Sequence, residues 1–155
     1  MPGEIESKLA AMGVTLPDAP APAANYVPYT ISGDLVFVSG QIPKDDNGLI
    51  TGKLGDGMSV SDGALAARQC AIALLAQLKA ACNGDLDRLV RVVKLGGFVN
   101  STPDFTDHPQ VINGASDFLG DALGEKGAHA RAAVGTSSLP LGVAVEIEGI
   151  FQISG

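Results

Sequence analysis

Arg131 and Glu146 are the two side chains in this sequence with the clearest capacity for chemistry. Arg131 begins a run of small apolar residues at 132–135, where a guanidinium group needs a partner. Two interpretations fit: a structural ion pair with a neighbouring carboxylate, or a bidentate clamp on the carboxylate or phosphate of a ligand. Glu146 lies between apolar neighbours in a segment that also holds Glu148. Burial there would raise its pKa into a range useful for general acid–base catalysis, whereas exposure would leave an ordinary surface carboxylate.

The other reactive residue types form no recognisable site. The sequence contains no Walker A loop, no GxGxxG, no HExxH and no CxxC motif. His108 and His129 each fall at the edge of a predicted element and are far apart in the chain, so we expect no metal site. Cys70 and Cys82 fall in one apolar helical stretch, too far apart along it for a disulfide. Buried free thiols are typical of a reducing cytosol.

The composition is that of one acidic globular domain. The chain has 155 residues, with 10 Lys and Arg against 17 Asp and Glu, which gives a net charge of −7. A chain of this length buries roughly two-thirds of its unfolded surface in a single core. An acidic chain with five Phe, two Tyr and no Trp is unlike a nucleic-acid binder, which needs a basic footprint and stacking rings. No segment has the pattern of a signal peptide or of a membrane helix, so we expect a cytoplasmic protein.

Periodicity and turn residues predict the element order β-β-α-β-α-β-β after a helical extension. The longest helical pattern covers residues 61–83, with Ser61 as its N-cap and Asn83-Gly84 as its end. A second helix begins at Asp107 and ends at Gly124. The predicted strands are residues 25–31 and 35–39 around a turn at 32–34, residues 86–99, and a final hairpin over 131–153 that turns at 139–142.

Elements in this order predict an α+β fold, a two-layer sandwich in which a mostly antiparallel sheet carries two helices on one face. The other face bears Glu146 and Glu148 among small and apolar residues. A half-covered sheet of this composition is expected to self-associate. Residues 1–24, a short helix followed by a Pro-rich linker, are predicted to precede a single domain over residues 25–155.

Two short motifs near the ends of that domain occur in the same order in one known family. The first runs from Asn25-Tyr26 to the sequence SGQIP at residues 39–43. The second combines Arg131 and Leu139-Pro140 with the sequence VEIE at residues 145–148. Together they resemble the signatures of the Rid family, also called the YjgF/RidA-like proteins, over roughly residues 25–153.

The resemblance implies a chorismate-mutase-like fold that assembles as a homotrimer with three clefts between subunits. It also implies hydrolysis of reactive enamine and imine intermediates to 2-oxo acids and ammonia, without metal or cofactor. An imine already hydrolyses in water, so orientation and one base are sufficient. The implied partner is a small carboxylated metabolite. The acidic, aromatic-poor composition and the lack of a membrane-helix pattern predict neither a nucleic-acid nor a membrane partner.

Carried over residue by residue, the resemblance assigns the carboxylate of the substrate to Arg131 and the attacking water to Glu146. Backbone groups of Gly40 and Ala133 would contact the imine region. The remaining residues implied to line the cleft are Tyr26, Ser39 and, by a weaker match, Asn113.

The chain departs from the compact members of the family in ways that leave other functions open. It has the N-terminal helix and Pro-rich linker, about three additional residues at 107–110, and Ala133 where some members have cysteine. These features indicate a longer branch of the family. A trimer that binds a small carboxylate without turnover and regulates a partner is the main alternative. Endoribonuclease activity is the third, and the net charge of −7 opposes it.

Overall fold

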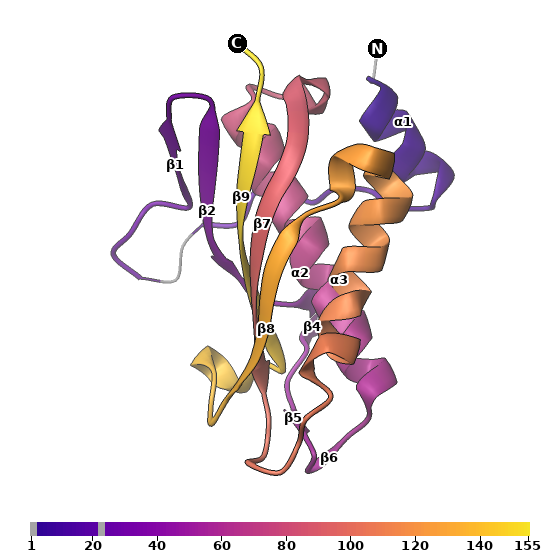
Figure 1. Ribbon diagram of the computed structural model, residues 1–155, viewed down its shortest axis with the longest axis vertical. Coiled ribbons are helices and arrows are strands. Elements are labelled where there is room, and N and C mark those ends of the chain that lie inside the picture. Colours follow the sequence, from indigo (N-terminus) through magenta and orange to yellow (C-terminus); the bar gives the residue numbers. More distant parts are fainter. Residues whose placement is uncertain (1–2, 22–23) are drawn as a thin grey trace.

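A five-stranded sheet, with strand order β1-β2-β9-β7-β8, forms the centre of the fold. The computed structural model describes residues 3–21 and 24–155, so positions 1–2 and 22–23 of the predicted N-terminal helix and linker lie outside the described residues. Figure 1 shows helices α2 and α3 on one face of this sheet and the other face without a helical cover.

The helices are α1 (Glu4–Ala11), α2 (Val60–Ala81) and α3 (His108–Leu123), with short 3-10 helices at Leu86–Arg88, Gly124–Gly127 and Pro140–Gly142. The strands are β1 (Tyr29–Ser32), β2 (Leu35–Gln41), β3 (Lys44–Asp45), β4 (Gly48–Leu49), β5 (Lys53–Leu54), β6 (Gly57–Met58), β7 (Leu89–Asn100), β8 (Ala130–Thr136) and β9 (Val145–Ile153).

The two long helices bury their small and aliphatic side chains against the sheet, as the α+β prediction requires. The N-cap of helix α2 lies two residues earlier than predicted. It is Ser59 and not Ser61, because the Ser59 side chain accepts a hydrogen bond from the backbone of Asp62. The predicted end is confirmed, since Asn83 and Gly84 adopt positive φ angles after the last turn. Helix α3 follows Asp107 and ends at a left-handed glycine, also as predicted.

The prediction of a final hairpin over residues 131–153 is wrong. Strand β8 pairs in parallel with β7 at the sheet edge, whereas β9 enters between β2 and β7 and is antiparallel to both. The segment around Pro140–Gly142 therefore crosses from the edge to the middle of the sheet. Strand β9 carries a row of buried apolar side chains, Val145, Ile147 and Phe151. Such a row suits a central strand that has a neighbour on each side.

Helix α1 packs on its own chain at the outer end of the helical layer. Ile5 and Leu9 are buried and join the main core. The Asp87 carboxylate accepts hydrogen bonds from the free backbone N–H groups of Glu4 and Ile5, which hold the N-terminus of the helix. No helix among the described residues is long and apolar enough to cross a membrane.

Candidate functional site

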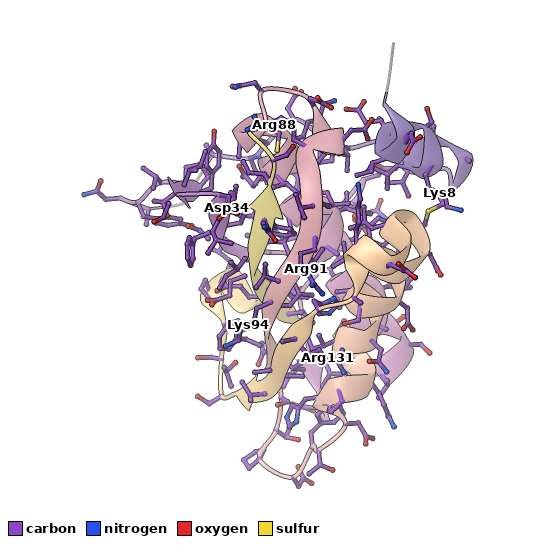
Figure 2. The ribbon with its side chains drawn as sticks, turned by 45° about the horizontal axis from the view of Figure 1, so that its top comes forward. Lys8, Asp34, Arg88, Arg91, Lys94 and Arg131 are labelled. Carbon is purple, nitrogen blue, oxygen red and sulfur yellow. The ribbon has the colours of Figure 1, made fainter. Side chains whose placement is uncertain are left out.

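Arg131 lies on the edge strand β8 with its side chain directed to α3. It pairs beside the buried Leu95, and so faces the helical side of the sheet. Its Nη1 donates a hydrogen bond to Ser116 Oγ at 2.9 Å, and its Nη2 donates to the Pro109 carbonyl at 3.3 Å. Figure 2 shows Arg131 next to the α3 ribbon. Two groups on one helix therefore hold the guanidinium at the edge of the sheet.

Both partners of the Arg131 guanidinium are uncharged. Within residues 3–21 and 24–155 the salt bridge is Lys79 to Glu6, at 3.3 Å, and no carboxylate pairs with Arg131. The structural ion pair considered for Arg131 is therefore absent from the described part of the chain. A half-buried cation held by neutral acceptors retains its capacity to bind an anion.

Asn113 and Ala133 belong to the same part of the molecule as Arg131. Asn113 follows Pro109 by one helical turn and precedes Ser116 by about another, so these three residues share one stripe of α3. Ala133 is half-buried and faces the same side of β8 as Arg131, two positions along the strand. These three predicted residues form one half of the candidate site, the arginine half.

Glu146 lies on the opposite face of the sheet. It alternates along β9 with the buried Val145 and Ile147, so its side chain projects from the face without helices. Burial raises the pKa of Glu146, and the neighbouring Glu148 carboxylate raises it further. The half-buried carboxylate is thus a stronger base than an ordinary surface glutamate when it is ionised.

Gly40 leaves the space that the Glu146 side chain occupies. A Cβ at this position would lie 2.6 Å from Glu146 Oε2 and 2.9 Å from its Cδ. Gly40 lies within an irregularity in the pairing of β2 with β9, between Val38 and Gln41. On the other side of β9, a Cβ at Gly96 would lie 2.9 Å from Glu148 Cγ. Each of the two glutamates therefore lies over a glycine on a neighbouring strand.

Ser39 and Tyr26 lie at the same end of β2 as Gly40. The Ser39 hydroxyl donates to the Val27 carbonyl at 2.8 Å, and its backbone N–H donates to Pro28. These bonds fix the segment that carries Tyr26, whose side chain is exposed. Tyr26, Ser39, Gly40 and Glu146 form the second half of the site, the glutamate half.

One chain does not close the predicted site around a small ligand. Strand β7 lies between β8 and β9, so the strands that carry Arg131 and Glu146 are two strand spacings apart, about 10 Å. They also point to opposite faces of the sheet. The predicted residues therefore form two separate halves, which face different surfaces of the same chain.

Sequence reasoning missed the residues that hold Arg131. Ser116 Oγ lies 2.9 Å from His129 Nε2, and His129 Nδ1 lies 2.6 Å from the Gly127 carbonyl. The spacing of His129 and Arg131 places both on one side of a strand, but nothing in the sequence shows that Ser116 packs against that side. His108 contacts Ser101 elsewhere, and the described residues contain no cluster of three metal-ligating side chains.

Three comparisons place this architecture among known proteins. The family model described as "YjgF/chorismate_mutase-like, putative endoribonuclease" matches residues 6–148. Protein TCP17 of Trypanosoma cruzi is 49% identical over 154 residues, covering 98% of this chain and 96% of its own. The crystal structure of Atu1372 from Agrobacterium tumefaciens, a protein of unknown function, has a TM-score of 0.90 at 50% identity and covers 97% of this chain and 92% of its own.

A more distant structure carries a ligand. E. coli TdcF, crystallised with bound serine, is 26% identical with a TM-score of 0.61, and the match covers 88% of this chain and 94% of TdcF. The sandwich of helices on a mostly antiparallel sheet is thus the chorismate-mutase-like fold that the sequence motifs implied.

Proposed function

We propose that this chain, which belongs to the Rid (YjgF/RidA-like) family, hydrolyses reactive enamine and imine intermediates to 2-oxo acids and ammonia in clefts between its own copies. The observation that carries the proposal is the division of the site. An unneutralised Arg131 and a Glu146 of raised pKa are complementary in chemistry, yet one chain holds them on opposite faces. A second copy brings the arginine half of one chain to the glutamate half of another.

The uncovered sheet face supports this self-association. It carries exposed apolar side chains, Phe37 at 40% and Val134 at 46% exposure, beside charges of both signs on β7 and β9. Strand β8, which bears Arg131, is an edge with one neighbour in the sheet. An apolar face with mixed charges is suited to burial against a second copy. The homotrimer implied by the sequence motifs uses this face and this edge, and its three interfaces form three clefts.

Each half of the cleft has a distinct part in the reaction. Arg131 binds the carboxylate of the substrate, and the Glu146 carboxylate accepts a hydrogen bond from water and directs it to the imine carbon. The water oxygen bonds to that carbon while the nitrogen gains a proton, which gives a carbinolamine. The hydroxyl proton of the carbinolamine then passes to the nitrogen as the carbon–nitrogen bond breaks, which releases ammonia and leaves the 2-oxo acid. An enamine enters this sequence after protonation of its carbon.

The remaining predicted residues complete the cleft. Backbone groups of Gly40 and Ala133 contact the imine region, while Tyr26, Ser39 and Asn113 line the walls. The serine bound to TdcF is a small molecule with the carboxylate and amino group that this site would recognise. The site as proposed uses no metal or cofactor, because water, one base and one cation are sufficient for imine hydrolysis.

A coupled assay tests the proposed reaction. A serine dehydratase generates 2-aminoacrylate, and the release of the 2-oxo acid is followed with and without this protein. We expect the wild type to accelerate release and Arg131→Ala to lose at least tenfold of that acceleration. Arg88→Ala is the matched control, because Arg88 bonds to the Ser154 carbonyl and belongs to neither half of the site. Equal rates for the wild type and Arg131→Ala would refute the proposal.

Binding without turnover is the second candidate, and the unneutralised Arg131 favours it independently of Glu146. A regulatory carboxylate-binding trimer would gain thermal stability from 2-oxobutanoate through Arg131, with no hydrolysis and no dependence on Glu146. RNA cleavage, named in the family description, fits less well because a net charge of −7 opposes association with phosphates.

A further inference from the structure

The Ser116 hydroxyl stands between the two basic side chains on the inner side of β8. Its Oγ lies 2.9 Å from His129 Nε2 and 2.9 Å from Arg131 Nη1. The other ring nitrogen, His129 Nδ1, lies 2.6 Å from the Gly127 carbonyl. Four groups, from α3, from the segment between α3 and β8, and from β8 itself, thus form one continuous chain of hydrogen bonds.

The direction of each bond in this chain follows from the chemistry of its ends. A carbonyl oxygen can only accept, so the Nδ1 of His129 carries hydrogen. In the neutral ring, Nε2 is then the acceptor, and the Ser116 O–H donates to it. The Ser116 oxygen is left with lone pairs that face the Arg131 guanidinium, which can only donate. The backbone carbonyl of Gly127 therefore sets the orientation of the hydroxyl that receives Arg131.

We propose that Ser116 and His129 are positioning residues that hold the Arg131 guanidinium ready for a substrate carboxylate. The proposal rests on the carboxylate-binding part of the proposed function. A guanidinium has five N–H groups, and the bonds to Ser116 and Pro109 use two of them. The other three have no hydrogen-bond partner among the described residues and remain available for a ligand. A long side chain that is already fixed loses less conformational freedom when the ligand binds.

The position of Arg131 explains why such a device is needed. Strand β8 is an edge, and the described residues provide no carboxylate to orient the arginine side chain. Without Ser116, the guanidinium would retain one weak contact, the 3.3 Å bond to the Pro109 carbonyl. His129 acts indirectly, since its hydrogen bonds go to Ser116 and to the Gly127 carbonyl and not to Arg131.

Binding of 2-oxobutanoate, measured by calorimetry, tests the role in carboxylate recognition. We expect Ser116→Ala and His129→Phe each to raise Kd about tenfold, the lower end of what a hydrogen bond to a charged group contributes. Ser116→Thr retains the hydroxyl and is expected to restore binding to within about threefold. Ser61→Ala, at an exposed position of α2, is the matched control and should bind as the wild type does.

The mobility of the arginine gives a readout that does not depend on any ligand. With ¹⁵N-labelled arginine, we expect separate, slowly rotating Nη signals for Arg131 in the wild type, assigned by their loss in Arg131→Lys. In Ser116→Ala and His129→Phe these signals should merge as rotation becomes fast. Circular dichroism and thermal unfolding show whether each variant remains folded.

The outcomes separate this inference from the proposed function. Wild-type protein that binds 2-oxobutanoate without hydrolysing 2-aminoacrylate refutes the reaction, whereas loss of binding in the two variants still supports the positioning role. Unchanged Kd values and unchanged Nη signals in Ser116→Ala and His129→Phe overturn the positioning role, whatever the hydrolysis rates are. Absence of any 2-oxobutanoate binding by the wild type overturns both.

Discussion

Replacing Gly40 by alanine is the sharpest test of the glutamate half of the site. The added Cβ would lie 2.6 Å from Glu146 Oε2, whereas ordinary van der Waals contact begins near 3.4 Å, so the carboxylate must move by about 0.8 Å. The group that must move is the end of a flexible side chain, which costs of order 1 kcal/mol in an unfavourable rotamer. Alanine is also better than glycine in a strand by a similar amount. The free energy of unfolding should therefore change by less than about 1 kcal/mol.

The effect of Gly40→Ala on catalysis should be much larger than its effect on stability. A catalytic group misplaced by about 1 Å can lower a rate about a hundredfold, which corresponds to about 2.7 kcal/mol in the activation free energy. We expect a loss of that size in kcat for 2-aminoacrylate hydrolysis. Gly96→Ala is the matched control, because its Cβ would lie 2.9 Å from Glu148 Cγ and would displace that side chain on the same face of the sheet. Its kcat should stay within about threefold of the wild type.

A double-mutant cycle decides whether Gly40 acts through Glu146. If it does, Gly40→Ala should have little further effect in the Glu146→Gln background, because the displaced carboxylate is already absent. A second hundredfold loss in that background would show that the methyl group obstructs the ligand directly. Equal losses in Gly40→Ala and Gly96→Ala would refute the assignment of the water to Glu146.

Two further predictions concern the packing of α3 and the titration of Glu146. Gly114→Ala places a Cβ against the Ala64 backbone oxygen, far inside van der Waals contact, and should lower the free energy of unfolding by about 3 kcal/mol. Gly120→Ala, which has open space around it, should raise the free energy of unfolding by up to about 1 kcal/mol. Urea titrations at equal protein concentration measure both. Activity should fall as pH drops through the raised pKa of Glu146, and Glu148→Gln should move this loss to lower pH in the kcat/KM profile.

The local elements were predictable because their signals are local. Ser-Gly-Asp at residues 32–34 marks the hairpin turn, and Gly124 marks the end of α3, by backbone preferences that neighbouring residues set. The N-cap of α2 was misplaced by two residues because Ser59 and Ser61 are equally good caps in sequence. The final hairpin was wrong for a different reason: a turn signal shows where a strand ends and not which strand it will pair with.

The sequence by itself determined the α+β class and the family, and it predicted Arg131 and Glu146 as the candidate cation and carboxylate of the site. Only the tertiary structure decided that β7 separates Arg131 from Glu146 and that they face opposite sides of the sheet. It also decided that Ser116 lies within hydrogen-bond distance of both Arg131 and His129, and that Gly40 makes room for Glu146. These facts depend on strand order and on which helix face covers which strand. Both are set by burial of the whole apolar surface, and no short segment of the chain contains that information.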